Sequence, residues 1–170
     1  MNTKIPLYNY LNMVLTGLIF TGCLFFIFVN DTHFEVYSIL IDSLSVVSET
    51  ALLVVLFAII YEVGYIINRI GSIFIEPLFM KLKIIEYNED YSLFNDAKNE
   101  YPILSTLSRE YAVSRTQVTL FLLVLLASFI KLNIFFICIS FICIFIFAFS
   151  MSKHSKKINK LILSYYEKIS

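Results

Sequence analysis

Three charged residues stand at intervals of seven in a strongly apolar stretch of the sequence: Glu62, Arg69 and Glu76. On an α-helix this spacing is nearly two turns, so the three side chains would share one stripe. A charge at membrane depth is costly unless it is paired, hydrated or extended to the headgroups, and by default it indicates a functional site. We therefore take Glu62, Asn68, Arg69 and Glu76 as candidates for binding or coupling. The alternative is a structural ladder of ion pairs, with Arg69 reaching the headgroups.

Small residues form a second pattern in the same region. Gly64 and Gly71 are also seven apart and share a stripe with Asn68. Glycine lets two helix backbones approach closely, so this stripe predicts a helix contact. The first apolar segment carries a comparable small-residue face: Thr16, Gly17, Thr21 and Gly22. We expect Gly17, Thr21, Gly64 and Gly71 to serve helix packing.

The composition indicates a membrane protein. The chain has 170 residues, is 59% hydrophobic and has a mean hydropathy of +0.81, whereas soluble domains are about 45–50% apolar. Apolar runs predict four transmembrane helices at about 9–29, 44–69, 116–131 and 133–150. We expect an all-α integral membrane protein with one membrane domain over residues 1–170. The second run exceeds the roughly 20 residues that a bilayer requires, so it should tilt or protrude.

Three local features decide how these runs are delimited. Phe20-Thr21-Gly22-Cys23 resembles a loose lipoprotein cleavage box, but the apolar run continues to Val29, which favours an uncleaved span. Pro77 predicts a helix end or a kink. Only Lys131-Leu132-Asn133 separates the last two runs. A single helix would bury Lys131 at the centre of the bilayer, so a tight hairpin is the better prediction.

Two polar regions complete the chain. Segment 76–115 is acidic in its middle and carries apolar residues at roughly helical spacing. It predicts a small helical cytoplasmic cap, which either packs under the bundle or docks a partner, and we favour a cap that does both. Residues 152–170 combine one apolar helical face with five lysines. This pattern predicts an amphipathic tail on an anionic leaflet.

The basic residues also predict the orientation. Lys131 is the only Lys or Arg expected on one side of the membrane, and all the others fall on the opposite side. The positive-inside rule then places both termini in the cytoplasm.

Motifs that would indicate an enzyme are absent. The sequence has no Walker A, GxGxxG, HExxH or GxSxG pattern. Cys23, Cys138 and Cys143 lie inside apolar runs without a CxxC pair, and His33, in the acidic segment Asn30 to Asp42, matches no metal-ligand spacing. We therefore expect no catalytic residues, no cofactor and no metal site.

One pattern resembles a known family. It consists of Gly64-Tyr65-Ile66-Ile67-Asn68-Arg69-Ile70-Gly71-Ser72 with Glu76-Pro77, followed by Tyr91, Ala97, Leu107-Ser108-Arg109-Glu110 and Arg115. This pattern covers residues 60 to 120 and resembles the membrane-subunit family of the Kiwa bacterial anti-phage defence systems (KwaA). It leaves the first span and the tail without support from the resemblance.

The resemblance implies a role and a location. A member of this family would detect phage attack at the bacterial inner membrane as a multi-pass protein, and it would act with a cytosolic KwaB-like subunit that engages phage DNA. We expect that partner to dock on residues 76–115, and we expect no direct nucleic acid binding by this chain. A membrane disturbance that re-pairs Glu62, Arg69 and Glu76 would then reposition the cap.

Two other functions fit the residues. The first is a subunit of an oligomeric pore or channel, whose path would be lined by the polar residues Thr16, Thr21, Ser45, Ser48 and Glu62. The second is a non-catalytic accessory subunit of a transport complex. A homo-oligomer is expected in any case, because the small-residue stripes of the first two spans require partners.

Overall fold

The computed structural model describes residues 7–28, 46–86 and 91–169, with the side chains of 46–49, 91–93 and 169 outside the description. Several sequence predictions concern residues beyond these ranges. They include Lys4, the acidic segment Asn30 to Asp42, and the acidic residues Glu89 and Asp90.

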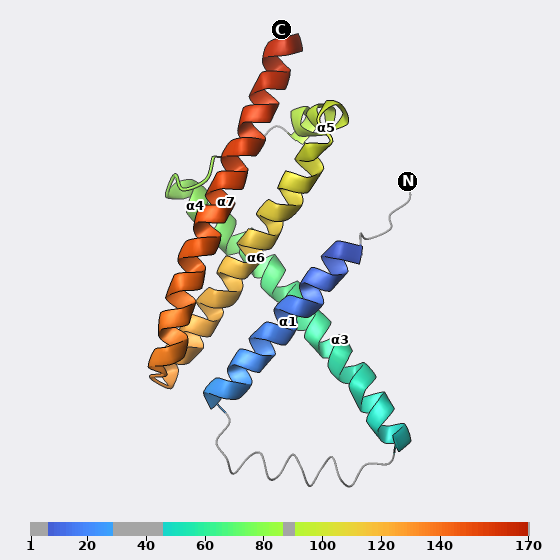
Figure 1. The fold of residues 1–170 in the computed structure, drawn as a ribbon, viewed down its shortest axis with the longest axis vertical. Coiled ribbons are helices and arrows are strands. Elements are labelled where there is room, and N and C mark those ends of the chain that lie inside the picture. Colours follow the sequence, from blue (N-terminus) through green and yellow to red (C-terminus); the bar gives the residue numbers. More distant parts are fainter. Residues whose placement is uncertain (1–6, 29–45, 87–90, 170) are drawn as a thin grey trace. The chain divides into compact units, whose positions relative to one another are not determined.

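All the described elements are helices (Figure 1). In chain order they are α1 (Leu7–Phe28), α3 (Val46–Ile70), the π-helical turn η1 (Gly71–Ile75), α4 (Glu76–Lys81), α5 (Tyr91–Glu100), α6 (Ile103–Ile130) and α7 (Ile134–Ile169). Four segments are long and apolar enough to cross a membrane: Leu7–Phe28, Thr50–Lys81, Ile103–Ile130 and Ile134–Lys168. The predicted all-α protein with four such helices is confirmed.

The chain forms two compact units, which are described separately. The membrane unit comprises Met1–Arg69 and Leu120–Phe141, and the polar unit comprises Ile70–Thr119 and Ile142–Ser170. Helices α6 and α7 each contribute to both units.

The membrane unit has a small core and a large apolar surface. Its buried centre joins residues of α1, α3 and α6: Ile27, Ile67, Leu120, Val124 and Ala127. By contrast, α3 is exposed at every residue from Thr50 to Ile59. A helix that is apolar all round is stable only in an apolar environment, so this surface suits a lipid bilayer.

The chain turns between α6 and α7 where the sequence predicts the hairpin. Helix α6 ends at Ile130 and α7 begins at Ile134. Leu132 adopts a left-handed conformation (φ 51°), and the backbone N–H of Asn133 donates to the Ser128 carbonyl at 3.0 Å. Lys131 is exposed, with its ammonium nitrogen 5.5 Å from the centre of the Phe28 ring.

Asn133 caps the start of α7, and this contact yields a prediction. Its side-chain Oδ1 accepts the backbone N–H of Phe136 at 3.3 Å, which satisfies one of the unpaired donors of the first turn. Replacing Asn133 by Ala should destabilise the protein by about 1 kcal/mol, whereas Asn133→Ser should retain most of the stability. Thermal unfolding in detergent measures both variants, and equal losses for Ala and Ser would contradict the capping role.

The polar unit is built from η1, α4, α5 and the adjoining parts of α6 and α7. Its core contains Ala97, Leu104 and Ile162, surrounded by partly buried Phe94, Tyr101, Ile158, Leu161 and Tyr165. The segment after α4 is fastened to α7, because the Ser152 hydroxyl donates to the Ile84 carbonyl at 2.7 Å and the Ser155 hydroxyl donates to the Glu86 carbonyl.

The C-terminal segment differs from the predicted tail on a leaflet. Residues 152–169 continue α7 without a break. Ile158, Leu161 and Ile162, the apolar face predicted to contact lipid, instead pack in the core of the polar unit. The amphipathic pattern identified the face correctly, but apolar residues of α5 and α6 also require burial, and they cover it.

The chain remains helical at Pro77, where the sequence predicts an end or a kink. The preceding turn is η1, in which the Glu76 N–H donates to the Gly71 carbonyl five residues earlier. Pro77 then lies in the first turn of α4, a position that needs no N–H donor. The π turn also breaks α-helical periodicity between Arg69 and Glu76, so the assumption of one continuous stripe is wrong.

Candidate functional site

Glu76 lies at the centre of a buried polar cluster in the polar unit. Its position on α4, next to buried Ile75 and Phe79, directs the carboxylate inward, and the residue is 9% exposed. The Tyr111 hydroxyl donates to Oε1 at 2.9 Å. The Arg115 guanidinium forms an ion pair with Oε2. Tyr111 and Arg115 stand one turn apart on α6, so a single helical face supplies both donors.

This cluster satisfies a carboxylate that would otherwise be costly to bury. Both oxygens of Glu76 accept charge-assisted hydrogen bonds, which are stronger than neutral ones. The side chains of Arg115 and Glu76 are only 13% and 12% exposed, so water screens their attraction weakly. The arrangement therefore holds α4 against α6.

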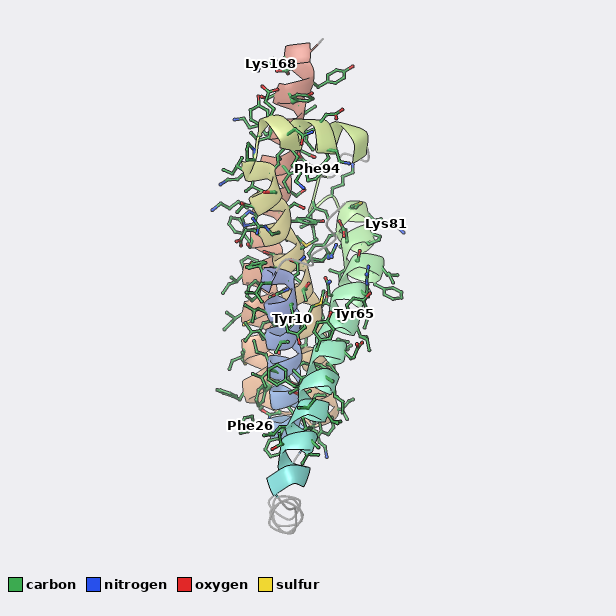
Figure 2. The ribbon with its side chains drawn as sticks, turned by 90° about the vertical axis from the view of Figure 1, so that its right-hand side faces the viewer. Tyr10, Phe26, Tyr65, Lys81, Phe94 and Lys168 are labelled. Atoms are coloured by element: carbon green, nitrogen blue, oxygen red, sulfur yellow. The ribbon has the colours of Figure 1, made fainter. Side chains whose placement is uncertain are left out.

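Arg69, the partner of Glu76 that the sequence spacing suggests, makes a different contact. Its guanidinium donates to the Tyr65 hydroxyl at 2.8 Å and lies 4.9 Å from the centre of the same ring. Tyr65 in turn stacks on Tyr61, which stacks on Tyr10 of α1; Figure 2 labels Tyr10 and Tyr65. Arg69 thus belongs to an aromatic row in the membrane unit.

The other two coupling candidates also lie in the membrane unit. Glu62 is exposed on α3, and Asn68 is half-buried. The structure therefore brings Glu76 together with Arg115 and Tyr111, and the contact of Arg69 is with Tyr65. The sequence signal for Arg115 was its position just before a long apolar run, four residues after a tyrosine.

The packing candidates form two contacts. Gly17 of α1 and Gly64 of α3 meet face to face, and a Cβ at either glycine would lie 1.8 Å from a backbone carbonyl oxygen of the facing helix. The Thr21 hydroxyl donates to the Gly17 carbonyl at 2.9 Å. In the polar unit, Gly71 faces Thr119 and Arg115 of α6. Gly17, Gly64 and Gly71 thus lie at helix contacts, whereas a Cβ at Gly22, on the same predicted face as Gly17, would have nothing within 4 Å.

A cavity of about 190 Å³ adjoins the Glu76 cluster. Hydroxyl, amide, charged and apolar groups of α4, the segment after it, α5, α6 and α7 line it: Glu76, Glu86, Phe94, Ser108, Tyr111, Ala112, Arg115, Ser155, Ile158, Asn159 and Ile162. Within the described residues, no group of three or more His, Cys, Asp or Glu is placed to hold a metal ion. The cluster is an ion pair with a tyrosine hydrogen bond, and the cavity beside it has both polar and apolar walls.

Further polar contacts tie α7 to its neighbours. The hydroxyls of Ser114 and Ser150 lie 3.0 Å apart in a hydrogen bond between α6 and α7. Lys168 forms an exposed ion pair with Glu100 at the end of α5. These contacts and the apolar core make α5 a packed part of the polar unit.

Comparison with known proteins gives no match: no protein family model, no curated protein and no solved structure is similar to this chain.

Proposed function

We propose that the protein is the membrane component of a two-part bacterial anti-phage defence system, which senses infection at the inner membrane and acts with a cytosolic partner. The proposal combines the resemblance of residues 60–120 to the Kiwa membrane subunits with four helices of membrane-spanning length. The observation that carries it is the buried contact of Glu76 with Arg115 and Tyr111, because these residues belong to the resembling segment.

The geometry supports a relay rather than catalysis. Helix α4 follows the apolar α3 through η1, and Glu76 on α4 is bonded to α6. A displacement of α3 that moves α4 would stretch or break the ion pair, and the polar unit would lose this contact between α4 and α6. Such a pair acts as a switch only if a second arrangement also satisfies its charges.

The polar unit offers a surface for the partner. Helix α5 buries Ala97 and exposes hydrophilic residues: Asn95, Asp96, Lys98, Asn99 and Glu100. This exposed face of α5 lies within the predicted docking segment 76–115. A polar, mixed-charge face suits a partner that binds and dissociates rather than a permanent subunit.

Phage plating tests the proposal. Cells carrying this gene with its adjacent gene should resist a subset of a broad phage panel, and cells carrying either gene alone should plate phage at full efficiency. Asp96→Lys on the exposed face of α5 should reduce protection while the protein level in the membrane stays constant. Full sensitivity of the two-gene strain to every phage would reject the defence function, and ion flux from purified protein in liposomes would then be measured.

A further inference from the structure

Helix α4 and the turn before it are apolar on both faces. The inner face is covered by the polar unit, where Ile75 and Phe79 are buried. From η1 to the residue after α4, the chain exposes four large apolar side chains: Ile73 (63%), Phe74 (64%), Leu78 (47%) and Leu82 (58%). Ile73 and Phe74 lie in η1, Leu78 lies in α4, and Leu82 directly follows α4. We call these four residues the outer apolar stripe.

The length of the helical segment limits where this stripe can lie. Thr50–Lys81 has 32 residues, which gives about 48 Å of helix at 1.5 Å per residue. The hydrocarbon core of a bilayer is about 30 Å thick. About 20 residues of helix are enough to cross that core. About 12 residues of this segment therefore extend past the core, and η1 (5 residues) and α4 (6 residues) lie at its C-terminal end.

Charged residues mark the far end of the stripe. Lys81 and Lys83 are exposed beside Leu78 and Leu82, and Figure 2 labels Lys81 at the end of α4. Lysines at the edge of an apolar face extend their ammonium groups to lipid phosphates while the alkyl stems cover apolar surface. The one carboxylate of α4, Glu76, is on the opposite face in its pair with Arg115.

We propose that the outer apolar stripe, with Lys81 and Lys83, is a membrane-interface anchor that inserts into the boundary between headgroups and acyl chains of a leaflet containing anionic lipids. The apolar residues enter the acyl boundary, and the two lysines bind the phosphates. This surface is distinct from the coupling pair and from the exposed face of α5. It anchors the polar unit to the bilayer, and this role does not depend on which partner the unit binds.

The absence of tryptophan from the chain allows a direct measurement of depth. In Phe74→Trp the new residue is the only tryptophan, and it replaces an exposed aromatic side chain with little disturbance of packing. The full-length variant is reconstituted in vesicles of phosphatidylcholine and phosphatidylglycerol. Lipids brominated near the glycerol end of the acyl chain should quench its fluorescence about twofold, as expected for a shallow position. Lipids brominated near the chain end should quench it less, and acrylamide should have little effect.

Ile103→Trp is the matched control, because Ile103 is exposed to a similar extent (58%) in the same unit but lies outside the stripe. This control should be quenched by acrylamide and not by lipid. Leu78→Trp supplies a second position on the stripe and should behave like Phe74→Trp.

If the outer apolar stripe lies in water, against protein or deep in the bilayer, the quenching of Phe74→Trp should differ from the result expected above. Acrylamide quenching of Phe74→Trp equal to that of the control would place the stripe in water, and protection from both lipid and acrylamide would show that protein covers it. Stronger quenching from the chain end would indicate a fully embedded helix. Any of these three results would overturn the proposed anchor.

Discussion

Replacing Gly64 by Ala should separate α1 from α3 and lower the stability of the membrane unit substantially. The added Cβ would lie 1.8 Å from the Met13 carbonyl oxygen and 2.7 Å from its carbon. These are backbone atoms of a helix, so they cannot rotate away as a side chain would, and the two helices must move apart. Forced overpacking of this kind costs about 1–3 kcal/mol and sometimes more, and we expect the upper part of that range.

The chain offers two matched controls for this experiment. Gly22→Ala, on the facing helix α1, places its Cβ with nothing within 4 Å, so it should leave stability unchanged or raise it slightly through higher helix propensity. Gly71→Ala should give an intermediate loss, because its nearest obstacle is the Thr119 hydroxyl at 2.6 Å, a side-chain atom. The midpoint of thermal unfolding is measured in detergent for all three variants. Equal midpoints for Gly64→Ala and Gly22→Ala would show that the close approach of α1 and α3 does not stabilise the protein.

These glycines illustrate what the sequence can predict. The small-residue stripes and the four apolar runs follow from composition and helical periodicity, which are local properties of the chain. The sequence does not identify which glycines face each other, because this depends on how two helices cross. Gly17 meets Gly64, whereas Gly71 faces a third helix.

The partner of Glu76 could not be predicted for two physical reasons. The interval of seven between Arg69 and Glu76 defines one stripe only on a regular α-helix, and η1 interrupts that regularity. The actual partner, Arg115, lies 39 residues later. Similarly, the apolar face of residues 158–165 is evident in the sequence, but lipid and a protein core are both apolar environments, so the pattern alone does not distinguish them.

Breaking the Glu76–Arg115 pair should have the second large effect. Glu76→Ala leaves a nearly buried guanidinium without its carboxylate and removes the acceptor of the Tyr111 hydroxyl. Removing one partner of a buried ion pair typically costs about 3–5 kcal/mol, and we expect a loss of about 3 kcal/mol because both side chains retain slight exposure. Glu100→Ala, which removes an exposed ion pair with Lys168, is the control and should change the unfolding midpoint little.

A double substitution separates a structural role of this pair from a coupling role. The double variant Glu76→Met with Arg115→Met removes both charges of this pair, and well-packed apolar residues often match or exceed the stability of a buried ion pair. We therefore expect the double variant to recover most of the stability lost by Glu76→Ala.

If the pair only holds α4 to α6, the double variant should also recover phage protection in the two-gene strain. If the pair relays a displacement of α3, cells that carry the stable double variant should remain sensitive to phage, because an apolar contact has no charges to re-pair. Recovery of both stability and protection would show that Glu76 has no coupling role, and it would not contradict the proposed defence function.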